Sequence, residues 1–188
     1  MVLLNRIYTR TGDDGTSALA TGERRPKSDL RFETIGTIDE LNAHVGLARL
    51  EAATLPDGLD AMLGRIQNDL FDLGADLATP QKPGRERLRI VAGQVERLEA
   101  EIDALNAGLA PLTSFVLPGG TPAAAALHLC RTVARRAERL AVALAGREPV
   151  NPEATRYVNR LSDFFFVAAR LANDGGAGDV LWVPGENR

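Results

Sequence analysis

The sequence predicts an all-α protein, folded as a five-helix antiparallel bundle. Its ten prolines gather at a few places and leave five long proline-free stretches. Proline is excluded from helix interiors because it lacks the amide proton and its ring collides with the preceding turn. Within each stretch, apolar residues recur at steps of three and four, the spacing of helices that cross at shallow angles in bundles. Strand signals are weak and confined to Leu3–Tyr8 and Val180–Val183.

Each proline-free stretch is assigned one helix of roughly 19–27 residues, a length usual for bundles with short connections. The apolar seams run, in chain order, from Ile38 to Ala52, Leu59 to Leu77, Leu88 to Leu105, Leu127 to Leu144 and Tyr157 to Leu171. Two helix starts are marked by a capping residue before a proline, Thr121-Pro122 and Asn151-Pro152. A side-chain oxygen at the first position caps exposed amides, and proline fits the first helical turn.

Composition narrows the possible classes of function. The chain has 188 residues, 45% hydrophobic and 25% charged, with a net charge of −3. We expect one domain, residues 1–188, comprising an N-terminal loop segment 1–33, a helical bundle 34–174 and a tail 175–188. The charge gives no basic field for nucleic acid or anionic membranes. No apolar run could span a membrane and no presequence is evident, so a cytoplasmic location is expected.

Metal and disulfide chemistry are limited by the same counts. One cysteine excludes an internal disulfide framework and every multi-cysteine metal site, and two histidines cannot build a histidine-rich centre alone. Cys130 lies on an apolar seam and is interpreted as core filler, as are the phenylalanines Phe164–Phe166. His44 carries no functional signal.

A glycine-rich segment near the N-terminus has the composition of a phosphate-binding loop. Residues 8–18 combine glycines with threonine and serine hydroxyls, and Lys27 follows. Glycine lets amides converge on an anion, and hydroxyl groups add donors. An ordinary surface turn explains the same composition. No Walker A pattern is present.

The fourth predicted helix carries a polar flank. His128, Arg131, Arg135 and Glu138 share one side of it, and Pro118-Gly119-Gly120 precedes it. Arginine suits multidentate phosphate contacts. The alternative is a solvated face on which Glu138 pairs with Arg135.

On the fifth helix, Asn159, Asp163 and Arg170 form a polar line beside the aromatic seam. An asparagine and an aspartate one turn apart could hold Mg²⁺ together with its waters and a polyphosphate. An exposed helix surface accounts for the same spacing.

Six blocks now occur in order: YTRTGDDG from Tyr8, GERRPKSD from Gly22, GTIDELN from Gly36, FVLPGG from Phe115, LHLCRTVARRAER from Leu127 and YVNRLSD from Tyr157. Together they resemble the PduO-type ATP:cob(I)alamin adenosyltransferases, over residues 7 to about 174. The resemblance implies a five-helix bundle that forms homotrimers and binds ATP where two subunits meet. It implies transfer of the 5′-deoxyadenosyl group of ATP to Co(I) of a reduced corrinoid, with release of triphosphate.

The resemblance also implies roles for individual residues. ATP would be bound by Thr9, Arg10, Thr11, Gly12, Ser17, Ala18, Lys27, Arg135, Arg136, Glu138, Arg139 and Asn159. Asn159 would also contact Mg²⁺ through the nucleotide. Asp29 and Arg131 would form a salt bridge between subunits and order the N-terminal loop. Phe115 would displace the lower axial ligand of cobalt, and Arg135 would stabilise the departing triphosphate.

Two other functions fit parts of the sequence. A nucleotide-gated carrier of adenosylcobalamin with little turnover would use the same pocket, and release of triphosphate at steady state would separate it from an enzyme. A purely structural trimeric bundle would need both the glycine-rich loop and the arginine flank to be coincidental. Further expected partners are a reductase that supplies Co(I) and a corrinoid-dependent enzyme.

Overall fold

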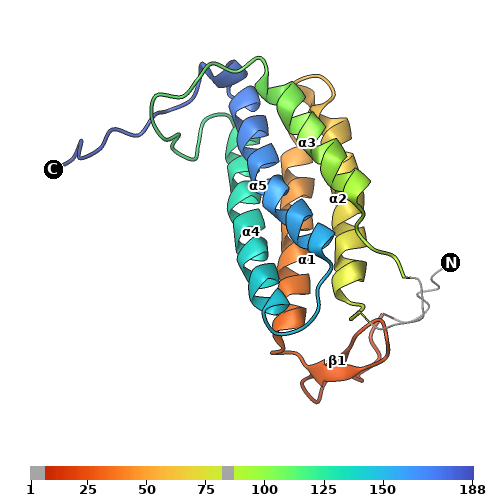
Figure 1. Cartoon of the computed structure of the whole chain (residues 1–188). Helices are drawn as coiled ribbons and strands as arrows, with labels where there is room; N and C mark the ends of the chain where they lie inside the picture. The colour runs from red at the N-terminus through yellow and green to blue at the C-terminus, as the bar shows by residue number, and fades with distance from the viewer. Residues whose placement is uncertain (1–6, 82–86) are drawn as a thin grey trace.

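The computed structural model describes residues 7–81 and 87–188, which form five α-helices, two 3₁₀ turns and a two-stranded hairpin. The helices are α1 (Leu30–Arg49), α2 (Leu59–Leu77), α3 (Ala92–Asn106), α4 (Pro122–Ala145) and α5 (Pro152–Ala172). Figure 1 shows that each helix runs opposite to the one before it in the chain. Helix α5 packs against both α3 and α4, and α1 packs against both α2 and α4. The predicted all-α, five-helix bundle is confirmed.

The core is formed by the predicted seams. Leu41, Leu63, Leu127, Tyr157 and Phe164 are fully buried at its centre. The hydrogen bonds of the capping residues also confirm the two helix starts predicted at Thr121-Pro122 and Asn151-Pro152. Thr121 accepts a hydrogen bond from the Ala124 amide at 3.1 Å, and Asn151 accepts one from Glu153 at 3.2 Å. No helix in the described ranges is both long and apolar enough to cross a membrane.

The third helix is shorter than predicted. Leu88 and Val91 match the apolar period but are exposed, and α3 begins only at Ala92 with 15 residues. The preceding segment is held extended by polar contacts. Asp76 accepts from Arg89 at 2.6 Å and from the Ile90 amide at 2.9 Å. Val91 itself is extended, with a φ of −118° and a ψ of 158°, so the helix begins at Ala92.

The strand predictions were mostly wrong. Strands β1 (Thr16–Ala18) and β2 (Arg24–Pro26) form an antiparallel hairpin, in register Ser17↔Arg25, within the loop segment rather than at the ends. At the C-terminal end only Leu181 pairs, as a single bridge to Val116. Within the predicted strand Leu3–Tyr8, residues 3–6 lie outside the described residues, and Ile7 and Tyr8 are not in a strand. In Figure 1 the hairpin lies beyond one end of the bundle, and the C-terminal tail runs beside the α3–α4 connection at the other end.

Candidate active site

The glycine-rich segment forms a tight loop that leads into the hairpin. The Asp13 amide donates to the Arg10 carbonyl at 3.3 Å, and Gly15 donates to Gly12 at 3.2 Å. Arg10 and Gly15 have positive φ angles of 63° and 82°. Both residues are in the left-handed backbone region, which turns the chain sharply at each end of the loop. The Thr9 and Thr11 hydroxyls lie 2.9 Å apart on this loop.

Lys27 lies directly over the loop. A Cβ at Gly12 would meet Nζ of Lys27 at 3.2 Å and the Thr16 carbonyl at 3.2 Å, so a side chain at this position would crowd the lysine. The Lys27 amide donates to the Gly15 carbonyl at 2.9 Å, which fixes the lysine backbone against the loop. The ammonium group of Lys27 therefore lies against the glycine-rich loop that also carries the Thr9 and Thr11 hydroxyls.

Asp14 braces the loop from within. Its carboxylate accepts from the Thr16 hydroxyl at 2.7 Å and from the Thr16 amide at 2.9 Å, and these bonds lower the pKa of Asp14. Arg24 lies 3.5 Å from the same carboxylate and donates to the Thr11 carbonyl. Asp14 thus bonds within the loop, and the charges of Arg24 and Lys27 also help to lower its pKa.

The arginines of α4 divide into paired and unpaired side chains. Arg136 forms an ion pair with Glu40 of α1. Arg135 and Arg139 are exposed and make no side-chain hydrogen bond or ion pair within the described ranges. Glu138 accepts a hydrogen bond from the side-chain Nδ2 of Asn159 at 2.6 Å, so the alternative pairing of Glu138 with Arg135 does not occur. Two guanidinium groups are left available for a ligand on this flank.

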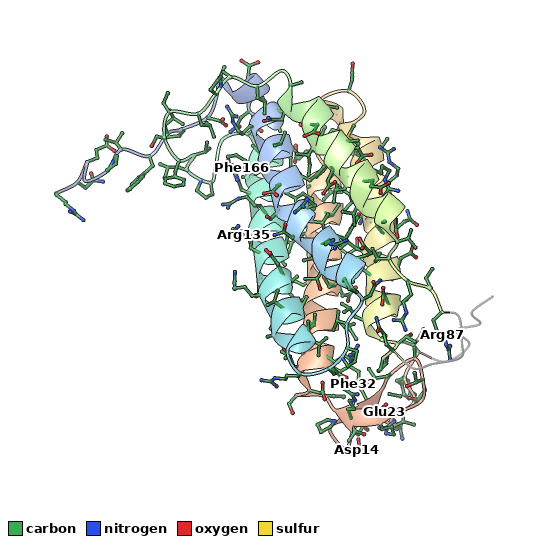
Figure 2. The ribbon with its side chains drawn as sticks, viewed as in Figure 1. Asp14, Glu23, Phe32, Arg87, Arg135 and Phe166 are labelled. Atoms are coloured by element: carbon green, nitrogen blue, oxygen red, sulfur yellow. The ribbon has the colours of Figure 1, made fainter. Side chains whose placement is uncertain are left out.

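The loop and the α4 flank are not brought together within one chain. Figure 2 shows Asp14 beyond the end of the bundle and Arg135 part-way along α4, facing outward. The hairpin instead contacts the α4–α5 connection, where Arg25 lies 3.0 Å from Glu148. The residues expected to bind ATP therefore form two separate groups, one around Lys27 and one around Arg135.

Phe115 lies on an exposed apolar surface at the opposite end of the bundle from the hairpin. Its side chain is 77% exposed, and it stacks at a tilt on Trp182, with ring centroids 6.0 Å apart. The two rings border a cavity of about 670 Å³, lined by Leu112, Thr113, Ser114, Phe115, Val116, Arg131, Phe166 and Trp182. Large apolar groups held in solvent around a cavity are typical of a binding site for an apolar ligand.

Arg131 and Asp29, the pair expected to bridge subunits, do not meet in one chain. Asp29 caps α1 by accepting from the Arg31 amide at 2.8 Å and lies 3.6 Å from Arg25. Nε of Arg131 is buried and has no hydrogen-bond partner among the described residues. Burial, followed by the charge of Arg135, lowers the pKa of Arg131. A buried guanidinium nitrogen without a partner is costly, so this position favours a carboxylate from elsewhere.

Among the residues that the structure describes, Cys130 and His128 are not activated for nucleophilic chemistry near these sites. Burial raises the pKa of the Cys130 thiol to about 12, and the residue is fully enclosed. This confirms Cys130 as core filler. Phe164 and Phe165 are also core residues, whereas Phe166 lines the cavity. His128 is buried with both ring nitrogens unpartnered, and burial lowers its pKa, which keeps the ring neutral.

The polar line predicted on α5 is broken up by the fold. Asn159 contacts both Glu138 and Arg160, and Asp163 is exposed. Arg170 is buried and paired with Asp179 at 2.8 Å. In the described ranges no group of three or more acidic, histidine or cysteine side chains could hold a metal ion.

The sequence analysis does not identify Trp182 and Phe166 as parts of the apolar site. Trp182 is the only tryptophan of the chain, and it lies in a tail that the six blocks do not reach. The available signal is the apolar run Val180–Val183, which contains this tryptophan near the end of the sequence. Phe166 was assigned to packing with its two neighbours, because a helical period alone does not distinguish a core face from the wall of a cavity.

The fold and these sites define a class: a helical bundle with a cationic glycine-rich loop, a cationic helix flank and an exposed aromatic cavity. Comparison with known sequences narrows the class to one family. The sequence model of the cobalamin adenosyltransferase family matches residues 7–172. The chain belongs to this family.

Relatives and solved structures agree with the assignment. The corrinoid adenosyltransferase of Mycobacterium tuberculosis H37Rv is 50% identical over 192 residues, which cover 100% of this chain and 97% of the relative. A PduO-type ATP:corrinoid adenosyltransferase from Lactobacillus reuteri, a phenylalanine-to-histidine variant complexed with cobalamin and ATP, has a TM-score of 0.86 and 37% identity, covering 95% of this chain and 97% of that one. An arginine-to-lysine variant of the same type and organism, complexed with ATP, has a TM-score of 0.84 and 38% identity, covering 95% and 100%.

Proposed function

We propose that this protein transfers the 5′-deoxyadenosyl group of ATP to Co(I) of a reduced corrinoid such as cob(I)alamin, and releases triphosphate. The observation that carries the proposal is Phe115, a 77% exposed phenylalanine on the rim of a cavity of about 670 Å³ in a member of this family. A corrin ring presents a broad face to such a surface. Phe115 then occupies the lower axial position of cobalt and keeps the benzimidazole ligand away, which makes Co(II) easier to reduce.

ATP is bound between two copies of the chain in this proposal. Lys27 and the glycine-rich loop supply positive charge and hydrogen-bond donors to the triphosphate from one copy. Arg135 and Arg139 supply them from the next copy. The separation of these groups within one chain supports the arrangement, because neither group alone surrounds a triphosphate. Arg131 supports it too, since its unpartnered Nε would receive the carboxylate of Asp29 from a neighbouring copy. The assembly we propose is a homotrimer.

Magnesium fits the site only as part of a nucleotide complex. No protein cage for a metal exists in the described ranges, and Mg²⁺ commonly binds through one or two carboxylates together with substrate phosphates. Glu138 and Asn159, joined by a 2.6 Å hydrogen bond, would hold it beside the triphosphate. When bound there, Mg²⁺ neutralises part of the charge on the triphosphate.

The reaction needs positioning and charge stabilisation rather than a protein nucleophile. The electron pair of Co(I) forms a bond to C5′ of ATP, and the C5′–O5′ bond breaks with its electrons leaving on triphosphate. The loop and the α4 flank hold C5′ in line with cobalt, which turns an encounter in solution into a directed step. Lys27 and Arg135 stabilise the negative charge that develops on the leaving oxygen. Delivery of the electron to Co(II) falls to a separate reductase.

An anaerobic absorbance assay tests the proposal. Chemically reduced cob(I)alamin is mixed with Mg-ATP and the protein, and loss of the Co(I) band is followed together with release of triphosphate. Many turnovers with formation of light-sensitive adenosylcobalamin are expected. A single equivalent of product per site would favour the carrier function instead. No binding of either ligand would overturn both.

A further inference from the structure

The C-terminal tail is fastened to the loop that carries Phe115 through main-chain hydrogen bonds. We call residues 107–121 the Phe115 loop. The Trp182 amide donates to the Phe115 carbonyl at 2.8 Å, and the Leu117 amide donates to the Val180 carbonyl at 2.8 Å. The Ser114 hydroxyl adds a bond to the Trp182 carbonyl at 2.7 Å. The tail thus contributes a short strand partner to a loop that has no other sheet neighbour in the described ranges.

Phe115 depends on this contact more than a core residue would. Because its side chain is largely in solvent, packing against the bundle does not fix its direction. Its carbonyl is held by Trp182, and its ring rests against the Trp182 ring. The direction of the Phe115 ring is therefore set by the position of the tail.

The tail is in turn held by one buried carboxylate. Asp179 accepts from Nε of Arg170 at 2.8 Å and from the side-chain Nδ2 of Asn173 at 3.2 Å. The Asp179 and Arg170 side chains are only 3% and 7% exposed. The turn between Asn173 and Asp179 contains Gly175 and Gly176 at positive φ, which folds the chain back so that Asp179 returns to the end of α5.

The partners of Asp179 also hold the Phe115 loop at both of its ends. Arg170 donates to the Ala110 carbonyl at 2.9 Å. Asn173 accepts from the Thr121 amide at 2.9 Å and donates to the Gly119 carbonyl at 3.3 Å. Asp179 therefore orients two side chains that secure the start and the end of the loop, while its own backbone leads into the strand that pairs with the middle.

We propose that Asp179 is a positioning residue for Phe115: through Arg170 and Asn173 it locks the tail and the Phe115 loop into one unit that presents the phenylalanine ring to the corrinoid. This inference rests on the proposed function for the identity of the ligand. The locking itself is a property of the free protein and can be measured without any substrate. The tail from residue 173 lies outside the part of the chain that matches the family model, so the family assignment does not by itself include it.

The test compares Asp179→Asn with Asp174→Asn. Asp174 lies five residues earlier in the same turn, is exposed, and makes no side-chain contact in the described ranges, so it controls for loss of a charge in the tail. In the free protein, Asp179→Asn is expected to shift the emission of Trp182, the only tryptophan, to longer wavelength. It should also speed hydrogen exchange of the Leu117 and Trp182 amides at least tenfold. Asp174→Asn should match the wild type.

In the functional assay, Asp179→Asn is expected to lower kcat tenfold or more and to reduce the four-coordinate fraction of bound cob(II)alamin in its visible spectrum. The KM for ATP should stay within twofold, and Asp179→Glu should recover part of kcat. A second pair of variants keeps both Asp179 and Arg170 and shortens the tail instead. A chain ending at Asp179 should show the same fall in kcat as Asp179→Asn, and a chain ending at Val183 should not.

The outcomes separate the two proposals. Unchanged tryptophan emission and unchanged exchange of the Leu117 and Trp182 amides in Asp179→Asn would overturn the positioning role, whatever the enzyme does. Altered emission with an unchanged four-coordinate fraction and unchanged kcat would also overturn the positioning role. The contacts of Asp179 would then hold the tail without orienting Phe115. Absence of adenosylation by the wild-type protein would overturn the proposed function. Tryptophan emission and amide hydrogen exchange alone would then decide whether Asp179 holds the tail against the Phe115 loop.

Discussion

Arg31 and Glu148, 117 positions apart in the chain, form an ion pair that joins the start of α1 to the connection between α4 and α5. Nε of Arg31 lies 3.0 Å from the carboxylate, and Arg31 also donates to the Leu77 carbonyl. Arg25 of the hairpin contacts the two oxygens of the same carboxylate at 3.0 and 3.3 Å. One glutamate thus links a fully buried arginine to the base of the glycine-rich loop.

Glu148→Gln should weaken this link and destabilise the fold at neutral pH. Burial opposes ionisation of Glu148, but the hydrogen bonds and charges of Arg25 and Arg31 outweigh it and lower its pKa from 4.5 to about 2. A folded pKa below the unfolded value adds stability above pH 4.5, which is lost as the pH falls towards 2. A shift of this size corresponds to about 3 kcal/mol. Urea unfolding at pH 7 and at pH 3 checks this, and an equal loss at both would contradict it.

Phe115→Ala should leave ATP binding unchanged and lower the adenosylation rate by about a hundredfold, equivalent to roughly 2.7 kcal/mol of barrier. In the proposed function the ring contacts the corrinoid and not ATP. Leu50→Ala, which trims another exposed apolar side chain, serves as a control. Steady-state kinetics with separate KM values for both substrates measure the effect. Near wild-type turnover in Phe115→Ala would exclude the role.

Arg135→Ala should weaken ATP binding about tenfold or more, since a guanidinium group can contact a phosphate through two nitrogens. Arg135→Lys keeps the charge and should recover only part of the affinity. Arg156→Ala removes an exposed arginine that pairs only with Glu153, and provides the control. Calorimetric titration with Mg-ATP gives the dissociation constants. Equal affinities in all four proteins would remove Arg135 from the triphosphate site.

Gly120→Ala should destabilise the protein by about 1–3 kcal/mol. Gly120 has a φ of 101°, and a Cβ there would lie 2.0 Å from Oδ1 of Asn173. Gly119→Ala has no such neighbour and no positive φ, so it should have little effect. Thermal unfolding of the two variants compares them directly. The prediction fails if their melting temperatures agree.

His128 should make the protein less stable in mild acid. Burial first, and then the charge of Arg131, lower the pKa of His128 below 6.5. Below that pH the unfolded chain binds a proton that the folded chain resists, so stability falls by up to about 1.4 kcal/mol per pH unit. His128→Leu should flatten the decline between pH 7.5 and 5.5, while His44→Gln should preserve it. Parallel melting curves for the wild type and His128→Leu would refute this.

The helices were predictable because their signals are local. Proline positions, capping residues and apolar steps act over a few residues, and each of the five stretches shows the apolar steps between prolines, with a capping residue before α4 and α5. The glycine-rich loop was predictable as a feature for the same reason. The hairpin was not, since strands of three residues such as Thr16–Ala18 are too short to show an alternation of polar and apolar side chains.

What the sequence could not reveal depends on contacts between distant residues. Leu88 fits the helical period, yet Asp76 and Asn151 hold its neighbour Ile90 extended. Arg170 has the spacing of an exposed polar residue, yet it is buried against Asp179. Glu138 has an arginine three residues away on its own helix but bonds Asn159 on the next one. In each case a long-range polar contact outweighed a local preference.

The distance between the Lys27 loop and the Arg135 flank within one chain has a consequence for mixed assemblies. If each ATP site takes its loop from one copy and its helix from the next, Lys27→Ala and Arg135→Ala damage opposite halves of the same site. Two preparations that are each inactive should then regain activity when they are unfolded and refolded together, because some interfaces in the hybrid oligomers join an intact loop to an intact helix. An inactivating change could therefore be compensated by a partner subunit that carries a different one.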